Sequence, residues 1–302
     1  IVQCRSITAY ADVFGRIVST GGTVCLKRNL VGGSASNEDG DIIIQGTASG
    51  ATLIAHQGSI DVKRADNCVI IGRRVVVGQA RNCDIVADEV SLDISEACAM
   101  AGKTIRVRIA RARRELDSVL LVLVPDLSSY EVQITALHKK RAALEKSIAG
   151  HRARIEALRG ENDVAKYLLL AGKLRNHELT LSPEQQVGWR RLAALVAPVV
   201  RTLVQLGEVV NELLAESNAL SEQVKAVIDA REESCSGVMC AVEKVEGETR
   251  VSAVMVRLAD SPLSALPGKD LKVRLRRTDA TTKLLFAGVG GHFEWSYRTP
   301  PK

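Results

Sequence analysis

Three cysteines stand at a constant interval of fifteen residues: Cys68, Cys83 and Cys98. Thiols spaced this regularly suggest two chemistries, a metal site or disulfide bonds. If the interval reflects stacked strands, neighbouring Cβ atoms lie about 4.8 Å apart, whereas a disulfide prefers about 3.8 Å. A straight row of three thiols also forms no tetrahedral metal site. We therefore interpret these cysteines as small buried hydrophobic residues, and expect neither metal nor disulfide.

A second candidate for chemistry is Gly102-Lys103-Thr104, which resembles the end of a phosphate-binding loop. That loop requires a glycine five residues before Gly102 and a helix after the motif. Here Ala97 occupies the glycine position, and the residues that follow are β-prone. The sequence therefore predicts no nucleotide or other cofactor.

Carboxylates could support a carbohydrate-active enzyme if several met on one face beside aromatic platforms for sugar rings. The candidates Asp61, Asp84, Asp88 and Asp93 are scattered, and no aromatic residue occurs between positions 14 and 130. We expect no catalytic residues, and keep a carbohydrate-active enzyme as the first alternative function.

A cluster of arginines is the third candidate, because it could bind an anionic partner such as nucleic acid. The chain has a formal net charge of +6 and a pI near 9.0, which permits such a partner without requiring one. Charged side chains also protect strand edges from unwanted pairing, and we favour this reading, so nucleic acid is not the expected partner. The cluster comprises Arg106, Arg108, Arg111, Arg113 and Arg114.

Composition limits the compartment and the core. Of the 302 residues 46% are hydrophobic but only 3% are aromatic, so the interior must be aliphatic. Seven cysteines without the spacing of a secreted domain indicate reduced thiols and a cytoplasmic protein. No uninterrupted apolar run reaches the roughly 18 residues of a membrane span, and we expect none.

The fifteen-residue interval extends beyond the cysteines. Each line of the repeat contains short β-prone runs separated by Gly, Asp, Asn or Lys, which leaves no room for crossover helices. A chain that coils once per line stacks each strand on its copy, as in a β-solenoid. Residues 1–126 are therefore predicted to form a right-handed parallel β-helix. Its aligned apolar positions are Val24, Ile42, Ile60, Val75, Val90, Ile105 and Leu120.

Residues 127–235 change to a heptad pattern, which predicts two helices that pair as an antiparallel coiled-coil hairpin with its tip near 181–183. Ser182-Pro183-Glu184 is a strong helix start. Pairing with a second chain, through the hairpin or through the solenoid end, would give a homo-oligomer and stays open. Complementary charges predict that Lys139 lies near Glu222, Lys146 near Glu216 and Arg152 near Glu212. The seam comprises Tyr130, Ile134, Leu137, Arg141, Leu144, Ile148, His151, Ile155 and Leu158, then Trp189, Leu192, Val196, Val199, Leu203, Leu206, Val210, Leu213, Ser217, Leu220, Val224 and Val227.

The last segment, 236–302, reads as a small β-rich cap on the solenoid end, with LKVRLRR among its expected strands. Phe293, Trp295 and Tyr297 alternate on one strand face. They could form a partner surface, although contact with the core is the favoured use.

This order of elements resembles the flagellar assembly protein A family of bacteria. The resemblance rests on 40–46 (GDIIIQG), on 55–62 (AHQGSIDV), on the column through Val124 and on the heptads that follow. It implies a cytoplasmic, non-enzymatic protein linked to flagellar assembly or placement, without catalytic residues.

The leading expectation is thus a scaffolding protein that presents a rigid rod and a projecting arm to protein partners. The first alternative is the carbohydrate-active β-helix enzyme. The second is a module that binds nucleic acid or another polyanion.

Overall fold

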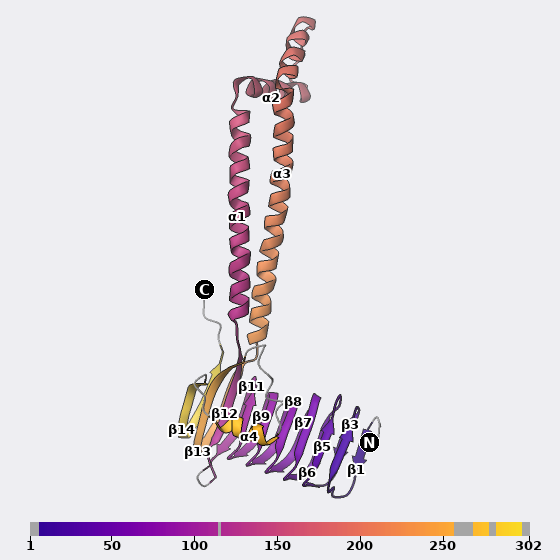
Figure 1. The fold of residues 1–302 in the computed structure, drawn as a ribbon, viewed down its shortest axis with the longest axis vertical. Helices are drawn as coiled ribbons and strands as arrows, with labels where there is room; N and C mark the ends of the chain where they lie inside the picture. Colours follow the sequence, from indigo (N-terminus) through magenta and orange to yellow (C-terminus); the bar gives the residue numbers. More distant parts are fainter. Residues whose placement is uncertain (1–5, 114–115, 257–267, 278–281, 298–302) are drawn as a thin grey trace. The chain divides into compact units, whose positions relative to one another are not determined.

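The computed structural model describes residues 6–113, 116–256, 268–277 and 282–297. The chain divides into two compact units, Leu127–Arg231 and a unit made of Ile1–Asp126 together with Glu232–Lys302. Residues from both sides of the helical segment therefore belong to one unit. Figure 1 shows the elements of both units.

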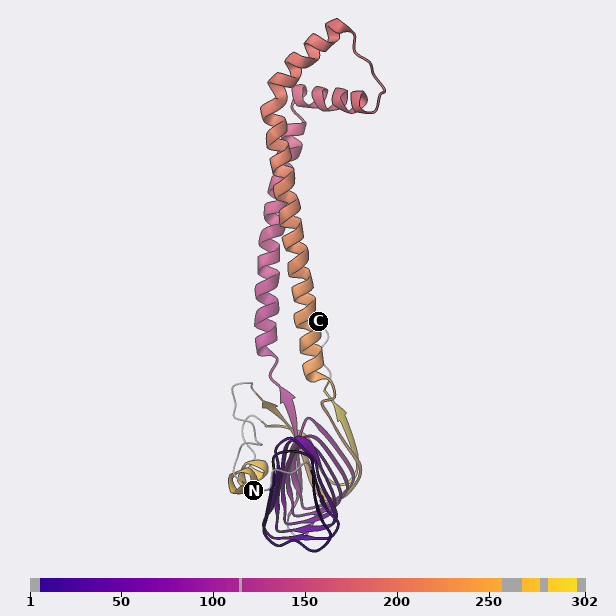
Figure 2. The same cartoon turned by 90° about the vertical axis from the view of Figure 1, so that its right-hand side faces the viewer.

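The larger unit is a β-solenoid of about seven turns. Viewed along the stack in Figure 2, its coils superimpose as nested loops. Its parallel strands before the helices are β1 (Ser6–Ala9), β2 (Arg16–Ser19), β3 (Thr23–Leu26), β4 (Leu30–Val31), β5 (Ser34–Asn37), β6 (Ile42–Ser49), β7 (Thr52–Asp66), β8 (Val69–Arg81), β9 (Asp84–Glu96), β10 (Ala99–Gly102), β11 (Thr104–Arg111) and β12 (Ser118–Pro125).

The predicted apolar column is confirmed over its first six positions. Val24 pairs with Ile42, and the column of paired residues continues through Ile60, Val75 and Val90 to Ile105. All six side chains are buried. Each fully buried aliphatic side chain contributes about 1.5–3 kcal/mol, so this aliphatic column is a main source of stability. The right-handed sense of the winding stays a prediction.

The prediction that Leu120 is the seventh residue of this column is wrong. Leu120 stacks on Met100 of β10, and the residue that follows Ile105 in the column is Cys240. The interval between stacked residues grows from 15 (Ala99 on Asp84) to 20 (Val119 on Ala99), because the corner before β12 is five residues longer.

One corner of the coil requires left-handed backbone. Residues at this corner have positive φ in successive coils: Gly32, Gly50, Asn67, Asn82 and Ala97. Glycine and asparagine tolerate this conformation, whereas alanine adopts it at a cost. Asn82 Nδ2 donates to Asn67 Oδ1 at 2.7 Å, so the two asparagine side chains also form a short ladder.

The C-terminal segment continues the solenoid. β13 (Met239–Val256) pairs in parallel with β11 through residues 239–246 and with β12 through residues 249–256. β14 (Thr282–Ser296) then pairs antiparallel with β13 and ends the stack. LKVRLRR (271–277) is not a strand: its first six residues lie in a helix, α4 (Gly268–Arg276). The C-terminal segment is thus β-rich as predicted, but β13 extends the stack, β14 covers its end, and α4 is a helix.

The smaller unit is helical. α1 (Ser128–Arg159), α2 (Asn162–Arg175) and α3 (Pro183–Cys235) follow one another, and α1 and α3 run side by side in Figures 1 and 2. α3 begins as predicted, because Ser182 and Gln185 exchange the two hydrogen bonds of a capping box, at 3.0 and 3.3 Å.

The predicted heptad positions are shielded in both helices. Every predicted seam residue in both helices is buried or half-buried, while their neighbours in α1 are exposed. Val196, Val210 and Val224 of α3, which are fourteen residues apart, are buried, as is Ile148 of α1. The sequence pattern thus identifies a shielded face on each of the two helices.

The first of the two predicted helices of the hairpin, which precedes the tip near 181–183, is not continuous. α1 ends before Gly160, and α2 lies across the direction of α1 in Figure 1. α2 instead packs on the start of α3, where the Tyr167 and Trp189 rings stack with centroids 4.8 Å apart. Among the described residues, none of the three predicted charge pairs between the arms (Lys139 with Glu222, Lys146 with Glu216, Arg152 with Glu212) forms an ion pair; Arg141 pairs with Glu145 within α1 instead.

α3 is long and apolar enough, by length and composition, to cross a membrane, although the sequence contains no uninterrupted apolar run of that length. Only 11% of its most apolar 18-residue window is buried within the chain. Arg201 and Glu208 interrupt its apolar residues. The same property suits a helix that packs against a partner.

Candidate functional site

The cysteine row is buried inside the solenoid. Cys68, Cys83 and Cys98 are free thiols, at most 1% exposed, and they follow the left-handed corner in three successive coils. The Cys83 thiol contacts the carbonyl oxygens of Ala65 and Arg81 at 3.3 and 3.2 Å. Hydrogen bonds with Cys68 and Cys98, together with burial, raise the pKa of the Cys83 thiol. The Cys83 thiol, held in its neutral form, is therefore a packing group and not a nucleophile.

The predicted arginine cluster is divided among different roles. Arg111 belongs to a column of stacked residues whose charges alternate: Asp66, Arg81, Glu96, Arg111 and Glu246. Arg81 Nε lies 3.0 Å from Glu96 Oε2, and Arg111 Nε lies 2.8 Å from Glu246 Oε2. Each arginine in this column is thus neutralised by an adjacent coil.

The other members of the cluster separate further. Arg106 and Arg108 lie on the outer face of β11, where Arg106 contacts Met239 Sδ at 3.6 Å and Arg108 lies 3.9 Å from Asp93. The backbones of Arg113 and Leu116 form an isolated antiparallel β-bridge. Arg114 lies outside the described residues. The four described arginines of the cluster thus have separate partners in the structure, with ion pairs at Arg108 and Arg111.

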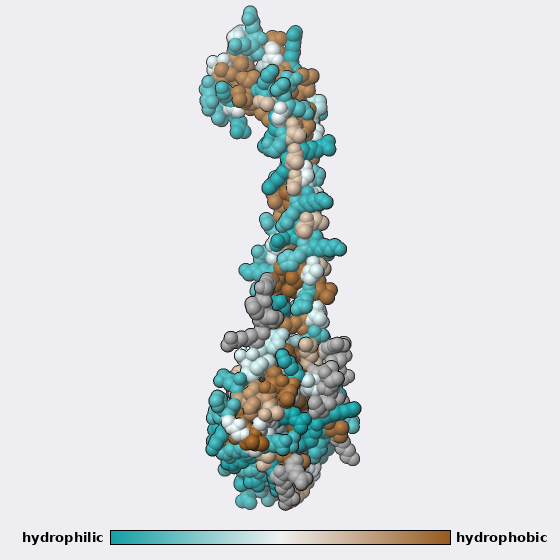
Figure 3. Space-filling view, turned by 90° about the vertical axis from the view of Figure 1, so that its left-hand side faces the viewer, coloured by the Kyte–Doolittle hydropathy of each residue, from teal (hydrophilic) through white to brown (hydrophobic). Residues whose placement is uncertain are grey.

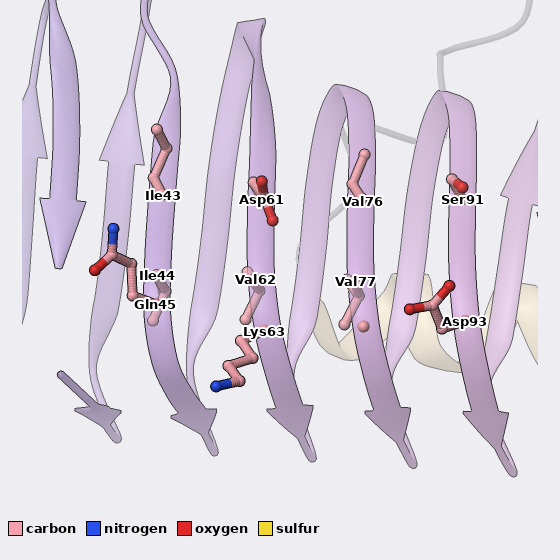
Figure 4. Close-up of a pocket in the computed structure, with 11 residues that line it drawn as sticks. Ile43, Ile44, Gln45, Asp61, Val62, Lys63, Val76, Val77, Ser91 and Asp93 are labelled. Carbon is pink, nitrogen blue, oxygen red and sulfur yellow. The ribbon is translucent and has the colours of Figure 1, made fainter. Parts of the chain in front are cut away.

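A shallow groove of about 510 Å³ runs over the outer face of β6 to β9 (Figure 4). Asp61 and Asp93 line it, but β8 with Val76 and Val77 lies between them. Asp61 in β7 and Asp93 in β9 are two coil steps apart, so their backbones are at least about 9.6 Å apart. The intervening strand β8 separates the two carboxylates, whereas the paired acids of a glycosidase flank one bond. The groove is lined by Ile43, Ile44, Gln45, Asp61, Val62, Lys63, Val76, Val77, Gly78, Ser91 and Asp93.

The aromatic residues of β14 close the solenoid end. Phe293, Trp295 and Tyr297 are half-buried and pack against the solenoid core together with Phe286, which sequence analysis did not single out. Phe286 and Phe293 lie 5.2 Å apart between ring centroids. On the same strand Leu284 and Val289 are exposed, and Figure 3 shows apolar side chains gathered at this end. The aromatic residues therefore contact the core, and the neighbouring apolar positions form the exposed surface.

A further site lies under α4, where sequence analysis predicted only a strand. Asp84 has a 2% exposed side chain and lies 3.6 Å from Arg276 Nε and 3.7 Å from Lys272 Nζ. Burial raises the pKa of Asp84, and the two cations oppose that rise. The sequence does contain a signal for this helix. Leu271 and Leu275 are four residues apart, and so are Lys272 and Arg276. Residues at this spacing lie on one face of a helix.

Within the described residues, no group of three or more metal-ligating side chains has the geometry to hold a metal ion. Comparison with known proteins adds no assignment: no family model, curated protein or solved structure matches the chain. The molecule is thus defined by its own geometry, as a β-solenoid into which a helical arm is inserted.

Proposed function

We propose that this protein is a non-enzymatic scaffold of the cytoplasm that presents a helical arm on a rigid solenoid to protein partners. The observation that supports this proposal most directly is the position of the arm in the chain. In one coil the single residue Lys103 joins β10 to β11. In the next coil the chain between β12 and β13 occupies that place, and it contains all of the arm.

Both ends of the arm are therefore fixed at one corner of the solenoid. Asp126 N donates to Val256 O at 3.0 Å as the chain leaves β12, and Met239 N donates to Lys103 O at 3.0 Å as it returns. An insertion at this point leaves the stack of paired strands unbroken and adds a helical surface to the solenoid. A scaffold that offers separate surfaces to several partners would use both parts.

We further propose that α1 and α3 form an antiparallel coiled coil. The support is the shielding of every heptad position and the buried valines of α3 at two-heptad intervals. Val210 and Val209 offer a matched test, because the first is 7% and the second 36% exposed. Val210→Asp should lower the melting temperature of the helical circular dichroism signal by several degrees, and Val209→Asp should change it little. Equal effects would reject the seam.

Flagellar machinery is the partner class that the resemblance of the sequence suggests, and we propose it here for the arm. Tagged full-length protein should retain flagellar or cell-pole components from a flagellated bacterium. The matched control carries Lys139→Glu, Lys146→Glu and Arg152→Glu on the exposed side of α1, and should lose them. A second control, with Arg74→Glu and Arg108→Glu on the solenoid, should keep them. Retention of no such component by the wild-type chain would contradict the flagellar link, and equal retention by all three would contradict the role of the arm.

A carbohydrate-active enzyme is the weaker alternative, because β8 separates the groove carboxylates Asp61 and Asp93 and the groove has no aromatic lining residue. Release of reducing sugar from bacterial polysaccharide, abolished by Asp61→Asn or Asp93→Asn, would replace the scaffold proposal. The anionic-partner alternative is weakened by the ion pairs of Arg108 and Arg111 with adjacent coils.

A further inference from the structure

The solenoid has an apolar strip on its outside, where a solvated strand face would be polar. The strip is formed by outward positions of β8, β9, β10 and β12, which stack in two rows in successive coils. α4 lies on this strip, outside the stack (Figure 2), and contributes two buried side chains, Leu271 and Leu275. The strip comprises Ile71, Val86, Ala99, Ala101, Val119 and Leu121.

One charged residue interrupts the strip. Asp84 stacks between Val69 and Ala99, so it occupies an otherwise apolar row, and its Oδ1 is buried without a hydrogen-bond partner. The cations of α4 are the groups that compensate its charge, at ion-pair distances of 3.6 and 3.7 Å. Arg276 also donates from Nη2 to the carbonyl of Ala97 at 3.1 Å.

We propose that this strip is a docking site for a short basic amphipathic helix of a partner protein, and that α4 is an internal occupant that competes for it. The ligand carries two leucines four residues apart, each followed directly by a lysine or arginine. This is the helix-in-groove mode of recognition, in which apolar anchors supply affinity and flanking charges supply selectivity. Asp84 is the selectivity-determining residue of the site.

The buried carboxylate is the reason to assign a recognition role. A helix that merely covered the strip would be held as well by an apolar residue at position 84, because a buried ion pair rarely gains more than its desolvation costs. A charged anchor instead rejects every helix without cations, because such a helix leaves the carboxylate buried and uncompensated. Burial alone raises the pKa of Asp84, which agrees with a site that tolerates its charge only beside Lys272 and Arg276.

α4 is also suited to exchange with a competitor. It is nine residues long, which is shorter than the roughly 12–15 residues at which an isolated helix becomes even marginally stable. Its attachment to the strip is through side chains, whereas the strands of the solenoid are joined by continuous backbone ladders. Elements with few buried contacts open locally before the rest of a protein unfolds.

The test uses a fluorescein-labelled peptide of residues 268–277 and the full-length protein carrying Leu271→Asp and Leu275→Asp, which detaches α4. Anisotropy should show binding to this open chain at least tenfold tighter than to the wild type, in which α4 occupies the site. A scrambled peptide of the same composition should bind neither. Equal affinity for both chains would overturn the proposal.

A double-mutant cycle tests the role of Asp84. Alanine at both cations of the peptide should weaken binding to the open chain at least fivefold, and should change binding little when that chain also carries Asp84→Asn. Equal loss in both backgrounds would remove the selectivity assignment.

Hydrogen exchange on the wild-type protein provides a measurement that does not depend on the open variant. Excess peptide should accelerate exchange in α4 by displacing it, and unchanged exchange would reject displacement. Wild-type protein that dimerises by exchanging α4 between copies would assign the site to a second copy and overturn the partner assignment.

Discussion

Ile105 and Cys240 are adjacent residues in one buried column of the solenoid, although 135 positions separate them in the chain. Both are 0% exposed, and burial raises the pKa of the Cys240 thiol to about 12. The column therefore resumes after the inserted helical arm. The last coil of the solenoid depends on residues that follow the arm in the sequence.

This continuity predicts that the arm is dispensable for folding. Replacement of residues 127–235 by a Gly-Ser linker of about eight residues should leave the solenoid intact, because the paired strands β12 and β13 then need only a short connection. Circular dichroism should keep its β-sheet signal, with a melting temperature within a few degrees of that of the whole chain. Loss of the cooperative β-sheet transition would show that the arm is required.

Ala97 predicts a stabilising substitution. Its φ of 53° lies in the left-handed region, which costs an alanine about 1–2 kcal/mol. Ala97→Gly should raise the free energy of unfolding by about 0.5 kcal/mol, because the relief of strain exceeds the roughly 0.5–1 kcal/mol entropy cost of glycine. Ala99→Gly is the matched control, because Ala99 is equally buried but has no positive φ. In urea titrations this variant should be less stable than the wild-type protein. Equal losses would contradict the argument.

The alternating charge column predicts sensitivity to charge reversal. Glu96→Arg would place three arginines in adjacent coils, at positions 81, 96 and 111. We expect the free energy of unfolding to fall by about 1–2 kcal/mol at low salt and by less at 1 M salt, where surface charges are screened. Glu89→Arg is the control, because Glu89 is 59% exposed and its 3.8 Å contact with Arg74 is loose. A loss for Glu96→Arg that does not depend on salt would point to packing instead.

Asp84 predicts a defined pH dependence of stability. Its folded pKa is raised, so the folded state binds this proton more tightly than the unfolded state does. Its contribution is therefore most favourable below the unfolded pKa, near 3.9, and is lost as the pH rises through the folded pKa. Asp84→Asn should gain stability relative to wild type at pH 7, and the difference should shrink as the pH falls towards 4. Urea titrations across this range measure it, and a difference that grows on acidification would refute the sign.

The aromatic end predicts unequal effects along one strand. Trp295 packs against the core beside Cys240, whereas Leu284 on the same strand is 58% exposed. Trp295→Ala should lower the free energy of unfolding by about 2 kcal/mol, and Leu284→Ala by less than about 0.5 kcal/mol. Thermal melts of the two variants distinguish them. Comparable losses would mean that this face of β14 is not the contact with the core.

The part of the fold that repeats locally could be predicted from the sequence. Val75, Val90 and Ile105 keep their interval because each coil closes with the same number of residues, and the seam from Ile134 to Leu158 keeps its heptads because one face of α1 is shielded. The prediction failed at Leu120, where a corner is five residues longer and the column shifts.

The remaining elements required three-dimensional information. Leu271, Val273 and Leu275 alternate like a strand, but Val273 is 65% exposed and the other two are buried on one side of α4. Nothing near Asp84 in sequence indicates its partners, which lie 188 and 192 positions later. The candidate docking site therefore depends on a contact that no local pattern encodes.

The place of the arm also determines when the stack can be completed during synthesis. From Pro125 to Met239 the ribosome must add 114 residues, which takes roughly 6 to 23 s at about 5–20 residues per second. Throughout that interval the outer ladders of β11 and β12 lack β13 and offer unpaired backbone groups to any nearby strand. The nascent chain is thus most prone to aggregation while its arm is being made.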